Sequence, residues 1–354
     1  MDDMTSTETP VVECNDVPQP NQILVSAQHI GYGVVVPVIC FFGLCTNCVN
    51  LVVLTRPEMK ETIFTYLTSL AAADLVTVTM MMFSSLYRGL GIKSYGWLVF
   101  DIYVHLPIAI ISSSTGTLLI VAITFERCFY VKWPTVAKRF SRKSTAKRVV
   151  TVIVLSSLLF HIPFCFSMKV DKNSVEIQAT KFNKSSGFLV YNWIRLSLFG
   201  FIPAFLIAVI NSILIYAVRQ MKKLRHKLIA QRQLAEDRRQ GEQIRLTITL
   251  IAITCMFYIG ELPSNIFSRK TATHILFGGN KCMMHSQFYK IMSLIINILV
   301  TLQYTLNFVF YCALNKKFMN VLRKVCPGTR RKKRASYRQS YYSSGIPTIA
   351  QARQ

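Results

Sequence analysis

Long apolar segments separated by short polar connections dominate the pattern along this chain. Seven of them reach the length of about 20 residues that an α-helix needs to cross the hydrocarbon core of a bilayer. They are Ile30–Leu54, Ile63–Leu86, Tyr103–Tyr130, Val149–Phe166, Ile194–Val218, Leu246–Ile266 and Ile291–Leu314. The alternating pattern of strands is confined to one connection. The chain is therefore predicted to be an all-α membrane protein built as a bundle of seven transmembrane helices.

The composition agrees with a membrane protein and changes the interpretation of the charge. Hydrophobic residues make up 52% of the 354 residues and charged residues only 16%, against about 25% charged residues in soluble domains. Lys and Arg exceed Asp and Glu by 41 to 16, a formal charge of +25. The basic residues lie between the apolar segments. They therefore indicate one basic membrane face in contact with the lipid bilayer, and no nucleic-acid partner.

The distribution of Lys and Arg predicts the orientation, because loops rich in these residues stay in the cytoplasm. Residues 1–29 contain no Lys or Arg and five acids, and they lack the features of a signal peptide. The connections on one side carry most of the base, at 132–148, 219–245 and 330–334. We expect a multi-pass plasma-membrane protein with its N-terminus outside. Its expected parts are an extracellular tail (1–29), the bundle (30–314), an amphipathic helix (315–326) and a disordered cytoplasmic tail (327–354).

Several polar residues and prolines interrupt the apolar segments. A charge inside a bilayer costs several kcal/mol and is a functional candidate by default. Asp74 lies within the second segment, and the pair Glu126-Arg127 ends the third. Pro203 and Pro263 lie in the fifth and sixth segments, where each permits a kink.

Taken in order, these residues resemble the pattern of the rhodopsin-like (class A) G-protein-coupled receptors over roughly residues 30–325. The matching residues are Asn47, Asp74, Glu126-Arg127, Pro203, Phe257, Pro263, Asn307 and Tyr311. Phe308 stands where the family usually has proline. The turn 54–59 and the sequence 307–312 look most like invertebrate neuropeptide receptors, near the FMRFamide receptors.

The resemblance implies a receptor and not an enzyme. It implies that an extracellular ligand, most of all a peptide, moves the sixth helix outward, so that a heterotrimeric G protein is activated inside. The implied switch residues are Glu126, Arg127, Pro203, Phe257, Pro263, Asn307 and Tyr311. Phosphorylation of the Ser-rich tail is expected to recruit arrestin. Two alternatives stay open: an ion-conducting or transporting seven-helix protein, and a degenerate receptor that no longer signals.

No cofactor is expected apart from a structural sodium ion. Carboxylate, amide and hydroxyl oxygens are the hard ligands that suit such an ion, and the candidates are Asp74, Asn47, Ser113 and Asn307. Gly116 stands where the family commonly has a hydroxyl residue in this site. A hydrogen-bonded contact between helices without an ion therefore stays the alternative for Asp74.

The ligand pocket is expected among polar residues in the outer halves of the segments. The candidates are His105, Ser112, Arg195, Glu261, Gln287 and Asn297. Glu261 stands where the family usually has an aromatic switch residue. It is expected to receive a ligand cation, to be protonated, or to pair with Gln303 or Asn297. An internal structural or switching role is the favoured interpretation.

The connection 169–192 contains the alternating runs 175–177 and 188–190 around a turn at 184–187. This pattern predicts a β-hairpin that covers the pocket. The tripeptide Asn183-Lys184-Ser185 is a glycosylation sequon.

The cysteines depart from the family pattern, since neither the start of the third segment nor the connection 169–192 contains one. Cys14 and Cys282 lie clearly outside, where the environment is oxidising, so a bridge between them is predicted. Two free thiols are the alternative. Inside, Cys326 follows the amphipathic segment 315–326 and is a candidate for palmitoylation.

Overall fold

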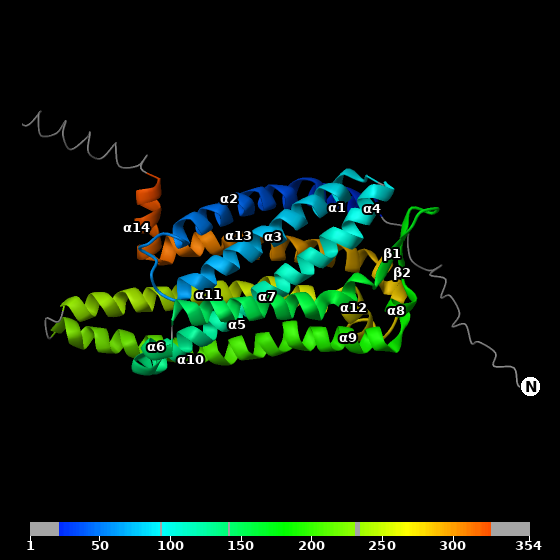
Figure 1. The fold of residues 1–354 in the computed structure, drawn as a ribbon. Coiled ribbons are helices and arrows are strands. Elements are labelled where there is room, and N and C mark those ends of the chain that lie inside the picture. The colour runs from blue at the N-terminus through cyan, green and yellow to red at the C-terminus, as the bar shows by residue number, and fades with distance from the viewer. Residues whose placement is uncertain (1–20, 93, 141, 231–233, 327–354) are drawn as a thin grey trace, which may run out of the picture.

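The protein is a bundle of long helices in the computed structural model, which describes residues 21–92, 94–140, 142–230 and 234–326. Seven helices within these residues are long and apolar enough to cross a membrane. They are Gln22–Leu54, Ile63–Leu90, Tyr95–Lys132, Lys143–Cys165, Ser186–Arg225, Ala235–Ile266 and Gln287–Leu314. The predicted fold class is confirmed. Figure 1 shows a short helix, α14, at one end of the bundle, here called the inner end, and a hairpin at the outer end.

Some of the spans consist of more than one element. In chain order the spans are α1 (Gln22–Ile30), η1 (Gly31–Val35) and α2 (Val36–Leu54); α3 (Ile63–Leu90); α4 (Tyr95–Phe100), η2 (Asp101–His105) and α5 (Leu106–Lys132); α7 (Lys143–Cys165); α9 (Ser186–Leu196), η3 (Ser197–Phe201) and α10 (Ile202–Ala230); α11 (Leu234–Ile266); and α13 (Gln287–Leu314). The connections contain α6 (Pro134–Phe140), α8 (Lys181–Lys184), α12 (Arg269–Ile275) and η4 (Lys281–His285). The amphipathic helix α14 (Lys316–Val325) follows the last span.

The elements η1, η2 and η3 are single π-helical turns with a common cause. Each ends two residues before a proline, at Pro37, Pro107 and Pro203. Proline has no N–H and collides with the carbonyl four residues earlier, which falls inside the π turn in all three cases. The wider ladder accommodates this collision, and the Val36 N–H bonds to the Gly31 carbonyl five residues back. Three spans therefore change their helical register in their outer halves.

The bundle is apolar both inside and outside, as expected for helices surrounded by lipid. A buried cluster including Leu67, Ile123, Phe257 and Tyr311 joins the spans around the inner half. Large apolar side chains such as Leu159 and Phe205 are more than 60% exposed. The exposed residues would face hydrocarbon, which removes the cost they would have in water.

The hairpin at the outer end consists of β1 (Met168–Asp171) and β2 (Glu176–Ala179), with Met168 opposite Ala179. The prediction of a hairpin is confirmed, but the second predicted strand is wrong, because residues 188–190 lie in α9. The Ser185 side chain accepts a hydrogen bond from the Phe188 N–H at 3.2 Å and caps this helix. The alternating pattern at 188–190 covers only three residues, which is too few to specify a strand where a capped helix begins.

Candidate functional site

A cavity of about 300 Å³ opens between the outer halves of the helices. Four of the six predicted ligand residues line it: His105, Arg195, Glu261 and Asn297. Apolar side chains such as Leu106 and Val300 complete its wall. The cavity therefore combines apolar side chains with many polar and charged ones, which suits a ligand that carries polar groups of its own.

The other two predicted ligand residues do not line the cavity. The Ser112 hydroxyl accepts a hydrogen bond from Thr77 at 2.8 Å and lies within hydrogen-bond distance, 2.9 Å, of the Ile108 carbonyl. It therefore joins α3 to α5. Gln287 is the first residue of α13, at the outer end of that helix.

Glu261 forms the floor of the cavity and bonds to two other helices. Its Oε1 lies 2.8 Å from the Ser113 hydroxyl of α5, and its Oε2 lies 2.9 Å from the Tyr304 hydroxyl of α13. The two hydroxyls are themselves 3.0 Å apart. The three side chains thus close a ring of polar contacts that ties α5, α11 and α13 together.

This ring supports the internal role expected for Glu261, with different partners from those named. Asn297 instead donates to the Tyr32 hydroxyl at 2.9 Å. Three contacts of hydrogen-bond length need three protons, whereas the hydroxyls of Ser113 and Tyr304 supply two. A protonated Glu261 carboxyl would supply the third, and protonation is one of the states expected from the sequence.

The upper wall of the cavity is held by polar contacts of its own. Arg195 donates to the Asn192 Oδ1 at 3.2 Å. The Arg88 guanidinium lies 5.8 Å from the centre of the Tyr32 ring. His105 Nδ1 lies 2.7 Å from the Asp101 carboxylate. These contacts fix the orientation of the polar side chains before any ligand binds.

The four candidate sodium ligands do not all meet in this structure. Asp74 is buried, and its Oδ2 accepts a hydrogen bond from Asn307 Nδ2 at 2.7 Å. Asn47 donates to the Gly43 and Tyr304 carbonyls, both at 3.0 Å. Ser113 belongs to the Glu261 ring. The hydrogen bond between Asp74 and Asn307 is thus present. It fits both a sodium site and the alternative of a contact between helices without an ion.

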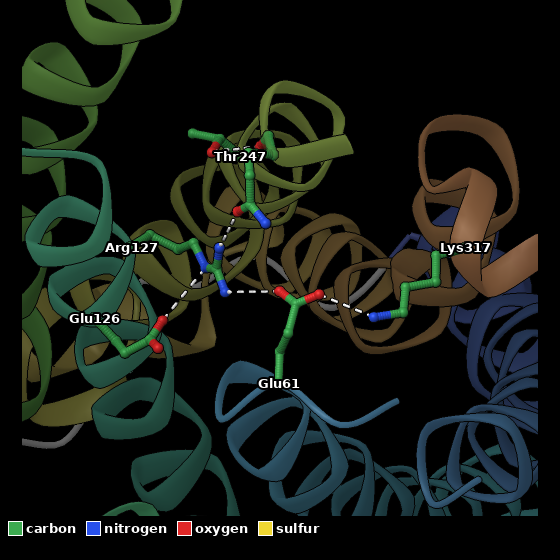
Figure 2. A network of polar contacts seen from close by, with 6 residues as sticks. Glu61, Glu126, Arg127, Thr247 and Lys317 are labelled. Atoms are coloured by element: carbon green, nitrogen blue, oxygen red, sulfur yellow. Dashed lines mark hydrogen bonds and ion pairs between the residues drawn. The ribbon is translucent and has the colours of Figure 1, made fainter. Parts of the chain in front are cut away.

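A second polar cluster surrounds Arg127 at the inner end of the bundle (Figure 2). The Arg127 side chain is 1% exposed, and its Nε lies 3.3 Å from Glu126 Oε2. Its Nη1 donates to the Gln243 Oε1 of α11 at 3.2 Å. Its Nη2 lies 3.9 Å from Oε2 of Glu61, a residue of the connection that precedes α3. Glu61 in turn binds Lys317 Nζ of α14 at 2.9 Å.

The remaining switch candidates include two buried aromatic residues and two prolines. Phe257 and Tyr311 are both 1% exposed. The Tyr311 ring packs on Phe318 of α14, with 5.2 Å between ring centres. Pro263 lies inside α11, and Pro203 is the second residue of α10. The two prolines therefore occupy the outer halves of adjacent helices.

The sequence reasoning missed Tyr304, Gln243, Glu61 and Lys317. Tyr304 is an aromatic residue within an apolar helix, which is typical of packing and gives no polar signal. Glu61 did carry a signal, because Glu58 and Glu61 are acids in a short connection on the otherwise basic side. Both form ion pairs with α14, through Lys324 and Lys317 respectively.

The two predicted modification sites differ in exposure, since Asn183 is buried and Cys326 is exposed. The Nδ2 of Asn183 lies 4.0 Å from Met168 Sδ, so a glycan on this nitrogen requires the local packing to open. Lys270 donates to the Asn183 carbonyl at 2.7 Å, and burial lowers the pKa of this lysine. Cys326 is exposed at the end of α14. Glycosylation and palmitoylation stay predictions.

Cys282 is disulfide-bonded in the structure. Eight other cysteines of the described part of the chain carry free thiols. Cys14, the predicted partner, lies outside the described residues. The bridge between Cys14 and Cys282 therefore stays a prediction.

Comparisons with known proteins agree with this architecture. The profile of the 7 transmembrane receptor (rhodopsin family) matches residues 46–315. A Caenorhabditis elegans protein named as a probable G-protein coupled receptor is 24% identical, and the match covers 80% of this chain and 67% of the relative. The FMRFamide receptor of Drosophila melanogaster is 22% identical over 87% of this chain and 56% of its own length. The Drosophila sex peptide receptor is 21% identical, and the match covers 84% of this chain and 72% of the relative. The chain belongs to the rhodopsin family of seven-transmembrane receptors.

Proposed function

We propose that this protein is a plasma-membrane receptor, with its outer end outside the cell, that binds a peptide and activates a heterotrimeric G protein. One observation carries the proposal: α11 takes part in both polar sites. Glu261 of α11 forms the floor of the outer cavity, and Gln243 of the same helix binds Arg127 at the inner end. A helix that contacts both sites couples them, because its displacement changes both.

The proposed mechanism is an outward movement of the inner half of α11. A ligand drives this movement only if it binds the displaced state more tightly than the resting state. The movement breaks the 3.2 Å bond between Gln243 and Arg127 and uncovers the buried guanidinium for the G protein. Pro263 leaves the carbonyl of Ile259 without its helical N–H partner, and this position between the two contacts permits α11 to bend there.

A peptide ligand is supported by the relatives and by the shape of the outer end. Two relatives are named FMRFamide receptor and sex peptide receptor. A cavity of about 300 Å³ holds only the end of a peptide, while the rest would extend over the hairpin β1–β2. The proposal includes arrestin as a partner of the tail 327–354, palmitoylation of Cys326, and a bridge from Cys282 to Cys14.

The test is G-protein activation in cells that express the protein, screened against amidated neuropeptides and read out for each G-protein class. A peptide that activates the wild type is expected to lose most of its effect on Arg127→Ala, because the buried guanidinium is then missing. Arg238→Ala is the matched control, since the Arg238 side chain is 86% exposed on α11. Surface-expressed wild type that stays silent towards every peptide and G protein would contradict the proposal.

The sodium site has a separate test at Gly116. A side-chain Cβ at this position would lie 4.0 Å from Asp74 Oδ1 and 3.7 Å from the Leu70 side chain, so a serine fits and brings a hydroxyl towards the carboxylate. We expect Gly116→Ser to increase the stabilisation that NaCl gives relative to choline chloride, because a further hard ligand joins the site. Thermal unfolding in the two salts measures it. Asp74→Asn keeps the contact with Asn307 but removes the charge, and an undiminished sodium effect in this variant would contradict the ion.

A further inference from the structure

The inner polar cluster contains a charge arrangement that the two-site mechanism does not explain. We propose that Glu61 is a positioning residue that restrains Arg127 in the resting state, and that Lys317 of α14 weakens this restraint by competing for the same carboxylate. The inference rests on the proposed function, namely that Arg127 acts on a G protein.

The contacts of Arg127 show where a charged restraint is available. The contact from α11 is the neutral amide of Gln243, at 3.2 Å. The two carboxylates belong to Glu126, on the same helix as Arg127, and to Glu61, at the start of α3. Glu126 lies next to Arg127 on the same helix and moves together with it, so this pair by itself does not join Arg127 to another helix. Glu61 is therefore the carboxylate that fixes Arg127 to a neighbouring element.

Glu61 is shared between two cations. Its Oε1 lies 2.9 Å from Lys317 Nζ, while its Oε2 lies 3.9 Å from Arg127 Nη2 (Figure 2). A cavity of about 20 Å³ lined by Glu61, Gln243 and Lys317 leaves the carboxylate room to shift between them. The shorter distance to Lys317 means that the lysine holds the carboxylate partly away from Arg127.

The surroundings of the two cations make the competition consequential. The Arg127 side chain is 1% exposed and the Lys317 side chain 33%. A charge pair of given length is stronger away from water. If Lys317 is absent, the Glu61 carboxylate is expected to move to the buried guanidinium and hold Arg127 more firmly. The position of α14 thereby affects the readiness of Arg127 to leave the resting state.

A parallel ion pair provides the control. Glu58 and Lys324 join the same connection to the same helix, with 3.2 Å between Nζ and Oε1, and neither residue contacts Arg127. The Glu58 carboxylate accepts hydrogen bonds from the backbone N–H of Glu58 and from the Lys324 ammonium, and these lower its pKa below the usual value. Loss of the Glu58–Lys324 pair removes a link between the connection and α14 without changing the charge next to Arg127.

The experiment measures agonist-free G-protein activation per surface receptor. Glu61→Gln is expected to raise it about threefold, and Lys317→Gln to lower it by a similar factor, as for loss of a partly exposed pair. Lys317→Gln is expected to have no effect in the Glu61→Gln background. Glu58→Gln and Lys324→Gln are expected to match the wild type. A merely structural role would lower activity in both the Glu61 and the Lys317 variants.

The inference is overturned if Glu61→Gln behaves like Glu58→Gln, or if the Glu61 and Lys317 variants shift activity in the same direction. A second measurement separates this failure from failure of the proposed function. Spin labels at the exposed positions Lys147 of α7 and Arg239 of α11 report the displacement of α11 in purified receptor. Opposite shifts of this distance in the two variants, without any G-protein response, would support the restraint and contradict G-protein coupling. Unchanged distances and activities would overturn the restraint alone.

Discussion

Replacing Glu261 with alanine is expected to lower the free energy of unfolding by about 3 kcal/mol, since a buried hydrogen-bonded acid is removed. The change leaves the hydroxyls of Ser113 and Tyr304 without the partner that each has at 2.8 and 2.9 Å. It also opens a void on the floor of the outer cavity. For a protein of this size, such a loss corresponds to a thermal midpoint about 4 °C lower. Thermal unfolding of the receptor in lipid nanodiscs measures it.

Glu261→Gln is the matched control and is expected to unfold close to the wild-type temperature. The glutamine amide donates to the Tyr304 hydroxyl, Tyr304 donates to Ser113, and Ser113 donates to the glutamine oxygen. The three contacts of the ring are then all hydrogen bonds, as with a protonated glutamate. A glutamine variant as unstable as the alanine variant would show that an ionised carboxylate holds the ring. The proton count would then be wrong.

Replacing Gly89 with alanine is expected to destabilise the receptor by about 3 kcal/mol, the upper range for overpacking a well-fitted contact. Gly89 lies near the outer end of α3, where it touches Gly33 of η1. A Cβ at position 89 would overlap backbone atoms of Gly33 and Tyr32, which cannot move aside as a side chain can. The two helices must then separate, and small residues at such crossings are what allow close packing in membranes. The thermal midpoint and the fraction of receptor at the cell surface measure the loss.

Gly33→Ala tests the same crossing from the other helix. A Cβ at position 33 lies 3.5 Å from the Gly89 Cα, an ordinary contact distance. Both substitutions replace a helical glycine with alanine and gain the same helix propensity. Their difference therefore isolates the steric overlap at Gly89. Equal midpoints for the two variants would contradict the close approach of α3 and η1.

The spans could be predicted from the sequence because each must satisfy its backbone within a continuous apolar segment. Some of their ends could not: α9 begins at Ser186, eight residues before the predicted start, whereas α11 ends at Ile266 as predicted. The residues that extend it, 186–193, mix polar side chains with apolar ones, so the continuous apolar segment begins later. The capping contact between Ser185 and the Phe188 N–H decides the helix start instead.

The polar sites could be predicted in their membership but not in their pairing. Glu261 and Arg127 stand out because charges inside apolar segments are costly. Their partners depend on which faces of different helices meet, and this information is not in a single helix. Glu261 thus binds Ser113 and Tyr304, whereas Gln303 and Asn297 were named as its partners. Glu61 and Lys317 are 256 positions apart and meet only when α14 folds back against the inner end.

The three π turns have a consequence for the descent of such receptors. A π turn holds one residue more than an α turn, so it rotates everything on its outer side by about 100°. Gain or loss of a single codon there rotates the side chains of the whole outer end of a span, while the residues on the inner side of the proline keep their positions. New ligand preferences can then arise by insertions and deletions as well as by substitutions. Counting from Pro37, Pro107 or Pro203 towards the outer end would pair non-equivalent residues in relatives that lack the extra residue.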